Sequence, residues 1–144
     1  MIGPSHRYET SKEVGNDDTN TTVMIQLAGL PSPGPFLGAT IHIDDVVRTH
    51  LDVLDERFKG HDSFILSSNS PDGTVYSDAL QFAKDKYPDL STKYSLPMNG
   101  TLPTVPLRLD ASKAEQAFGK FKPFEAQVLD LVAQYVALRD KEGQ

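Results

Sequence analysis

The chain has 144 residues, a net charge of −6 and no cysteine. Its length suits one domain, and its acidic balance excludes the basic patch of a nucleic-acid-binding protein and disfavours binding to anionic membranes. The lack of cysteine excludes disulfides and thiolate zinc sites. No apolar run is long enough to cross a bilayer, and residues 1–20 contain no signal-peptide-like stretch, so we expect a cytoplasmic protein.

The first part of the chain predicts a loop, a short helix and a second loop. Residues 3–20 are polar and turn-rich, and residues 16–20 are typical of a loop that ends in a helix cap. A short apolar run over residues 23–30 follows, and Gly29 is suited to end it. The sequence PSPGP at 31–35 breaks any regular element, so we interpret it as a loop.

The middle of the chain predicts a strand followed by a helix. Residues 39–43 are rich in β-branched side chains and predict a strand. Asp44 is suited to cap the next helix, and Asp45 places a second negative charge at its positive end. Apolar residues continue at helical spacing to Phe58, and Gly60 is expected to end this helix.

A second strand-and-helix pair is predicted next, followed by a loop. Residues 63–67 predict the strand, and Pro88 ends the helix. The apolar face of that helix comprises Tyr76, Leu80, Ala83 and Tyr87. Residues 88–104, rich in proline, serine and threonine, predict a loop, and residues 105–109 predict a short strand.

Two helices are predicted at the end of the chain. Residues 112–115 form a capping-box pattern, Gly119 is placed to end that helix, and Pro123 suits the first turn of the next. The last helix has the clearest amphipathic stripe, which we assign to core packing. The stripe comprises Phe124, Val128, Leu131, Val132, Tyr135 and Leu138.

Three stretches, in this order, resemble extended short-chain dehydrogenases/reductases of the epimerase/dehydratase and dihydroflavonol-reductase type, fungal members most of all. They are Ile2-Gly3-Pro4, the sequence IHIDDV at 41–46, and residues 109–125. In that family the first stretch ends the sixth core strand and opens the substrate pocket. The resemblance implies an α/β fold with few short strands and several helices. It implies a single domain over 1–144 that forms the C-terminal, substrate-side fragment of a Rossmann-type enzyme.

The resemblance also implies hydride transfer between a nicotinamide and a carbonyl or alcohol of a small organic substrate. It places Gly3, Pro4 and His6 nearest the substrate. The glycine-rich turn that cradles a dinucleotide is not found, because the glycines at 29, 34 and 38 surround a proline-rich loop with no strand before them. We therefore expect that the nucleotide-binding half is absent, and that the isolated chain binds neither NAD nor NADP and is inactive alone.

Residues 8–12 match the family's catalytic Tyr-x-x-x-Lys pattern literally, with Tyr8 and Lys12. In the family, the lysine lowers the tyrosine pKa and holds the cofactor ribose, while the tyrosine delivers a proton. That pair lies on a long helix upstream of the stretch resembled by residues 2–4. Here it follows that stretch in polar sequence, so we predict a coincidence, with both side chains exposed on a loop, and assign no catalytic residue.

No metal site is predicted. His42, Asp44 and His50 are near one another, and His6 and His61 are distant in sequence, whereas a metal needs three or four converging ligands. We interpret His42 as a half-buried structural histidine. The adjacent Asp44 and Asp45 side chains diverge, so they do not share a catalytic proton; Asp17 and Asp18 are assigned to a solvated loop.

Three functional hypotheses remain open. The chain is a truncated or split dehydrogenase, a non-enzymatic module that binds a small molecule or a partner, or a small enzyme that uses Tyr8 and Lys12. Four apolar residues would face neighbours that the chain lacks, so we expect self-association or a complementing half. These residues are Ile41, Ile43, Phe64 and Leu66. The sequence gives neither the substrate nor the choice between NAD and NADP.

Overall fold

Helices dominate the computed structural model, which describes residues 1–16, 19–58 and 62–143. The helices are α1 (Ser11–Asn16), α2 (Thr21–Leu27), α3 (Ile43–Asp52), the 3-10 turn η1 (Glu56–Phe58), α4 (Asp78–Lys86), α5 (Leu90–Lys93), α6 (Ser112–Phe118) and α7 (Phe124–Glu142). The strands are β1 (Phe36–Gly38) and β2 (Thr104–Pro106). No helix in the described ranges is long and apolar enough to cross a membrane.

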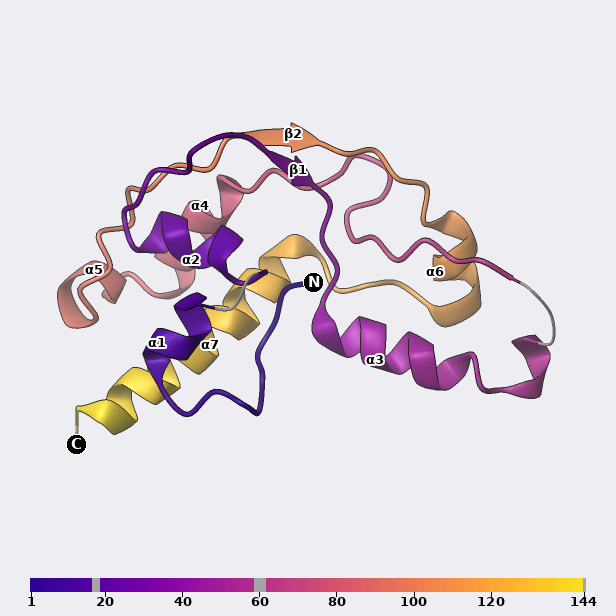
Figure 1. Ribbon diagram of the computed structural model, residues 1–144, viewed down its shortest axis with the longest axis horizontal. Coiled ribbons are helices and arrows are strands. Elements are labelled where there is room, and N and C mark those ends of the chain that lie inside the picture. Colours follow the sequence, from indigo (N-terminus) through magenta and orange to yellow (C-terminus); the bar gives the residue numbers. More distant parts are fainter. Residues whose placement is uncertain (17–18, 59–61, 144) are drawn as a thin grey trace.

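The long helix α7 organises the larger of two hydrophobic cores. It packs against α4 and α1, and α2 packs against α1 and α4 (Figure 1). The predicted stripe is confirmed, because five of its residues are buried and Tyr135 packs partly buried against them. Pro123 immediately precedes α7 at its N-cap, one position before the predicted first turn.

A smaller core gathers around α6, which lies at the other end of the molecule from α1 and α2 (Figure 1). Phe118 is its centre, with ring centroids 5.1 Å from Phe58 and 4.9 Å from Phe64. Gly119 ends α6 with φ = 82°, as predicted, because glycine adopts this backbone conformation without strain. Two lobes with separate cores thus meet along the chain's extended segments.

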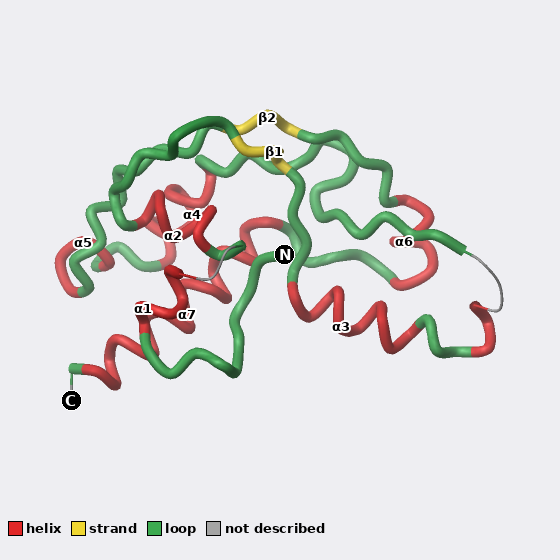
Figure 2. The backbone as a smooth tube through the Cα atoms, viewed as in Figure 1, coloured by secondary structure: helices red, strands yellow, loops and turns green. Residues whose placement is uncertain are grey.

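The two strands form a short parallel pair that crosses above both lobes (Figure 2). Leu37 is paired with Val105 in this register. One further parallel bridge joins Ile2 to His42 and another joins Pro31 to Thr101. The α/β fold class with few short strands and several helices is therefore confirmed.

The predicted strands over 39–43 and 63–67 are wrong. The strand lies earlier, at β1, and Ile43 already belongs to α3. Residues 62–67 have no regular structure. β-branched composition favours extended backbone, but a strand also needs a ladder partner. Phe64 and Leu66 instead pack against the smaller core.

Several helix boundaries also differ from the prediction. Helix α1 occupies part of the stretch assigned to a loop, and α5 forms one turn within 88–104. Helix α3 ends at Asp52, and η1 carries the chain on to Phe58. Gly60, predicted to end this helix, lies outside the described residues. In α6 the cap position is Ala111, and the Asp110 carboxylate, rather than Ser112, accepts a first-turn amide bond.

Candidate functional site

A cleft of about 790 Å³ opens between the N-terminal segment, α3 and α7. The structure brings Gly3, Pro4 and His6 together on its lining, although their contact with a substrate stays a prediction. The other lining residues come from the N-terminal segment, α3 and two further elements. They are Met1, Ile2, Ser5, Arg7, Tyr8, Thr19, Asn20, Ile43, Asp44, Val47, Arg48, Leu51, Asp52 and Gln134.

Backbone hydrogen bonds fix one edge of the cleft floor. The Ile2 amide donates to the Ile41 carbonyl at 2.9 Å, and the Ile43 amide donates to the Ile2 carbonyl at 3.0 Å. Gly3 follows with φ = 150°, and a Cβ atom there would lie 2.5 Å from Ile43 Cγ2. Only glycine can occupy position 3 at this short distance, so the floor of the cleft packs directly against the start of α3.

Two side-chain amides fix the other edge of the floor, and we call them the amide clamps. Asn20 accepts a bond from the Gly3 amide at 3.1 Å and donates to the Gly3 carbonyl at 3.0 Å. Gln134 accepts from the Ser5 amide at 2.9 Å and donates to the Ser5 carbonyl at 2.6 Å. Asn20 lies at the cap position of α2 but makes no capping bond with its side chain. Sequence reasoning missed both clamps, because nothing local signals a side-chain contact across 17 residues for Asn20 or 129 residues for Gln134.

The Tyr8 and Lys12 pair does not form the family's catalytic unit. Tyr8 is half-buried on a loop, and its hydroxyl accepts a bond from Asn20 at 3.1 Å. Lys12 is exposed on α1 and does not line the cleft. The prediction of two exposed loop residues is correct for the loop position of Tyr8 and the exposure of Lys12, but Tyr8 is half-buried and Lys12 is helical. The two residues nevertheless do not share a helix.

His42 lies beneath the cleft floor and caps α3. Its Nδ1 accepts a bond from the Asp44 amide at 3.0 Å, so the predicted capping role of Asp44 is wrong. The ring is fully buried rather than half-buried. Because Nδ1 is an acceptor, the neutral ring carries its proton on Nε2, which lies 3.3 Å from Asp130 Oδ2. Burial lowers the pKa of His42 and Lys122 lowers it further, whereas Asp44 and the other nearby carboxylates raise it.

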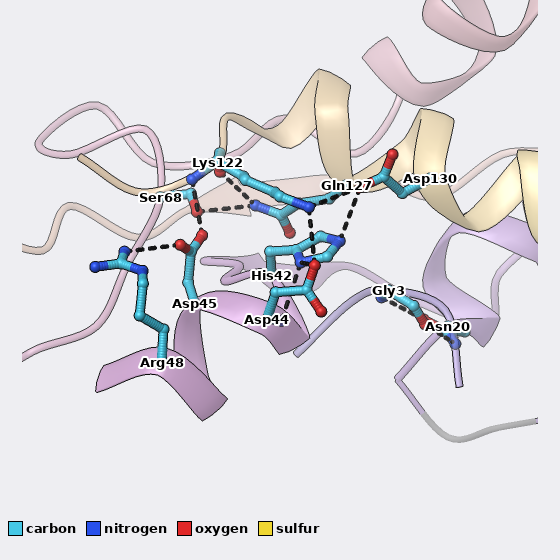
Figure 3. A network of polar contacts seen from close by, with 10 residues as sticks. All are labelled: Gly3, Asn20, His42, Asp44, Asp45, Arg48, Ser68, Lys122, Gln127 and Asp130. Atoms are coloured by element: carbon cyan, nitrogen blue, oxygen red, sulfur yellow. Dashed lines mark hydrogen bonds and ion pairs between the residues drawn. The ribbon is translucent and has the colours of Figure 1, made fainter. Parts of the chain in front are cut away.

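An ion-pair network joins the start of α3 to α7 (Figure 3). Lys122 Nζ lies 3.0 Å from Asp44 and 2.9 Å from Asp130. The hydrogen bond from Lys122 lowers the pKa of Asp44 below its ordinary value of 3.8. Asp45 accepts the Lys122 amide at 2.8 Å and pairs with Arg48 at 2.9 Å. The two adjacent aspartates thus bind different groups, Asp44 the Lys122 ammonium and Asp45 the Lys122 backbone amide and Arg48, and they form no catalytic pair.

No group of three metal-ligating side chains converges anywhere in the residues that the structure describes. His6 lines the cleft, whereas His50 contacts the Val46 carbonyl in its own helix at 2.7 Å. His61, Asp17 and Asp18 lie outside the described residues.

The N-termini of α3, α4 and α7, the three longest described helices, do not fit the phosphates of the dinucleotide that the resemblance implies. Phosphates bind at helix N-termini whose positive ends are unopposed. Here α3, α4 and α7 all carry acidic residues in the first turn. In α3 these are Asp44 and Asp45, and the His42 side chain takes up one of the free amides. A phosphate at these positions would meet a carboxylate.

Sequence comparison relates the chain to fungal ketoreductases. Ketoreductase CTB6 of Cercospora beticola is 41% identical over 106 residues, which cover 72% of this chain and 30% of the ketoreductase. Its counterpart in Cercospora nicotianae is 39% identical over the same coverage. The chain corresponds to the C-terminal portion of an extended short-chain dehydrogenase/reductase. It spans about 30% of the length of these curated relatives. No family profile matches it.

Solved structures of the same fold agree with this assignment. Yeast methylglyoxal/isovaleraldehyde reductase Gre2, complexed with NADPH, superposes with a TM-score of 0.65 at 20% identity, covering 96% of this chain and 44% of that chain. Gre2 from Candida albicans, also in complex with NADPH, gives a TM-score of 0.61 at 19% identity, covering 95% and 41%. At these identities the likeness establishes the fold of this dehydrogenase portion.

Proposed function

We propose that this chain supplies the substrate side of a nicotinamide-dependent oxidoreductase that acts on the carbonyl or alcohol of a small organic compound, and that it is inactive alone. The observation that carries the proposal is the cleft at Gly3, Pro4 and His6, in a chain related to ketoreductases. The NADPH in both structural neighbours favours NADPH as the nucleotide of the complete enzyme.

In this role the chain binds and orients the substrate. Backbone bonds to Ile2 and the amide clamps hold the floor rigid, so that a bound molecule meets a preformed surface. Apolar side chains, among them Val47 and Leu51, line one wall of the cleft. Hydride comes from the nicotinamide when it is bound, and we assign its binding to residues beyond this chain, because the acidic first turns of α3, α4 and α7 oppose a phosphate.

Titration calorimetry with NADPH and with NAD tests the proposal on the isolated chain. We expect no binding heat for either nucleotide, because acidic residues occupy the first turns of the three longest helices, α3, α4 and α7. Saturation-transfer NMR with isovaleraldehyde, the substrate in the name of one neighbour, should show contact with the wild-type chain. The contact should weaken in Asn20→Ala, which releases the floor, and persist in Thr92→Ala, at an exposed site on α5. Micromolar affinity for either nucleotide would contradict the proposal.

A non-enzymatic binding module is the second candidate, favoured by a cleft that is built without a nucleotide site. It predicts aldehyde binding but no NADPH oxidation even when the missing portion is supplied. A third candidate, an enzyme built on Tyr8 and Lys12, is disfavoured because the two residues lie on different elements. We further propose that residues 1–144 form one domain and that the protein is cytoplasmic.

A further inference from the structure

Arg7 lies on the N-terminal side of the cleft and carries a charge that no carboxylate offsets. The residue is exposed, and its backbone amide donates to the Ser5 hydroxyl at 3.3 Å. Within the part of the chain that the structure describes, its guanidinium makes no hydrogen bond or ion pair. Glu13, the nearby acidic residue, instead accepts the backbone amides of Glu9 and Thr10 at 2.7 and 2.9 Å. The Arg7 charge is therefore available to a bound molecule.

The charged side chains on the opposite wall of the cleft, which α3 forms, are already paired. Asp44 lies 3.0 Å from the Lys122 ammonium (Figure 3). Arg48 lies 2.9 Å from Asp45 and 3.8 Å from Asp52. Among the arginine and aspartate side chains that line the cleft, Arg7 is thus the one without an opposite charge within the described residues.

Much of the remaining lining is apolar. These residues are Met1, Ile2, Pro4, Ile43, Val47 and Leu51. The cleft therefore combines an apolar floor and wall with one unpaired cation at its side. A ligand that complements this lining has an aliphatic body and one anionic end. A guanidinium suits a carboxylate in particular, because it can donate two parallel hydrogen bonds to the two oxygens.

A smaller hollow of about 350 Å³ adjoins the cleft at Arg7. It shares Ser5, Arg7 and Tyr8 with the cleft, and Glu13 and Asn16 complete its lining. An anion in this hollow would meet the Glu13 carboxylate, whereas the carboxylates that line the cleft are paired with cations. We therefore place the anionic group on the cleft side of Arg7.

We infer that Arg7 determines the specificity of this cleft by binding a carboxylate, so that the substrate class is an aliphatic oxo acid. The inference rests on the proposed function for the carbonyl group, whereas the carboxylate follows from the charges and lining of the cleft. In the bound state the carboxylate lies at Arg7 and the aliphatic chain lies along Val47 and Leu51.

Three ligands with the same aliphatic body test the inference by NMR titration of the isolated chain. They are isovaleraldehyde, α-ketoisocaproate, which has a carboxylate in place of the aldehyde hydrogen, and the uncharged methyl ester of that acid. We expect the acid to bind roughly tenfold more tightly than the ester, which is the size of one hydrogen bond to a charged group. The advantage should shrink as salt is added, because Arg7 is exposed. Since the net charge of −6 opposes any anion, a preference for the acid reports a local cation.

Variants of Arg7 assign that preference to one side chain. Arg7→Gln should bind the acid no more tightly than the ester, with unchanged affinity for the ester and for isovaleraldehyde. Arg7→Lys keeps the charge but loses the paired donors, so it should keep part of the preference. The matched control is Arg108→Gln, at an exposed arginine that does not line the cleft, and it should keep all of it. Thermal midpoints of the Arg7 variants should equal that of the wild type, because the side chain holds nothing in the described fold.

Three results would overturn the inference. They are equal affinities of the wild type for acid and ester, a preference for the acid that survives Arg7→Gln, and displacement of the acid by equimolar pyrophosphate, which would assign Arg7 to a phosphate group. The proposed function fails separately. A chain that binds the acid through Arg7 but, co-expressed with the rest of Ketoreductase CTB6, oxidises NADPH with no carbonyl compound would refute that function and leave the role of Arg7 standing.

Discussion

At the scale of single residues, His42 joins the cleft floor to the helix beneath it. A Cβ atom on Gly3 would lie 3.1 Å from its Nε2, and its Nδ1 caps α3. The sequence favoured Asp44 for this role because aspartate is a far commoner capping residue. The Asp44 side chain is 65% exposed and pairs with Lys122 instead.

Replacing His42 should therefore destabilise the chain more than replacing Asp44. We expect His42→Ala to lower the free energy of unfolding by on the order of 1–2 kcal/mol from the lost cap, with a further loss from the cavity. Asp44→Ala removes a mostly exposed ion pair and should cost roughly 0–1 kcal/mol. His42→Asn keeps an acceptor near the position of Nδ1 and should recover part of the loss. Urea unfolding measures these free energies, and an equal loss of stability in the two alanine variants would refute the capping role of His42.

The same histidine predicts a pH dependence of stability. Burial lowers its pKa in the folded state below the ordinary value of 6.5, so the unfolded chain binds this proton more readily. The stabilisation from neutral His42 is present above about pH 6.5 and is lost as the pH falls towards the folded-state pKa. Of the charged groups that face the ring, Asp44 has a pKa lowered below 3.8 by its bond from Lys122, and Lys122 has a pKa raised above 10.5, so neither changes charge in this range.

Thermal midpoints between pH 7 and pH 5 measure this effect. We expect a decline in the wild-type protein and a shallower one in His42→Asn, which lacks the titrating ring. Parallel declines in the two proteins would assign the pH dependence to other groups.

At the scale of elements, local patterns predicted helices better than strands. Helix α7 was predictable because Phe124 to Leu138 repeat at helical spacing, and α6 because Gly119 marks its end. Strand β1 was not, since its partner β2 lies 68 residues away. Its first two residues, Phe36 and Leu37, are exposed and carry no alternating pattern. Among the site residues, Gly3 was predictable by resemblance, whereas Asn20 and Gln134 act through the fold alone.

The close contact between β1 and the loop at Thr74 predicts that replacement by alanine has very different effects on stability at two glycine positions. A Cβ atom at Gly38 would overlap the Thr74 carbonyl oxygen, whereas at Gly34 it would meet nothing within 4 Å. We expect Gly38→Ala to cost at least about 1–3 kcal/mol through overpacking. Gly34→Ala should change stability by no more than about 0.5 kcal/mol. Denaturant midpoints of both variants provide the measurement; a tolerated alanine at position 38 would disprove this packing.

At the scale of the whole molecule, the exposed apolar residues are not the ones that the sequence predicted. Ile41, Ile43, Phe64 and Leu66 were expected to face absent neighbours, yet all four are half-buried. Three of them, Ile41, Phe64 and Leu66, pack against the smaller core. The sequence could not show this, because that core brings together residues from before and after α4. The large exposed apolar residues lie instead on and just after α3 and on the strand pair, with others at Met1, Leu30, Ile65 and Val75.

The unequal sizes of the two cores predict unequal local stability. Phe64→Ala removes a ring that contacts Phe58 and Phe118 and should cost less than the roughly 3–5 kcal/mol of a fully buried phenylalanine, because Phe64 is half-buried. Hydrogen exchange should show faster amide exchange in α6 with unchanged protection in α7. Equal loss of protection in both helices would mean that the two lobes unfold as one unit.

The floor of the cleft stays in place only as long as the side-chain amides of Asn20 and Gln134 remain chemically intact. A primary amide has an acceptor oxygen and a donor nitrogen, as a peptide unit does. Asn20 and Gln134 therefore form paired hydrogen bonds with the backbone of Gly3 and Ser5, as a neighbouring strand would. Asparagine is thermolabile, and its deamidation leaves only acceptors. An aspartate at position 20 would place a carboxylate oxygen against the Gly3 carbonyl, to which Asn20 donates a hydrogen bond. That bond would be lost, and the floor of the cleft would no longer be held at Gly3. Deamidation of Asn20 would therefore loosen the floor of the cleft while both hydrophobic cores stay intact.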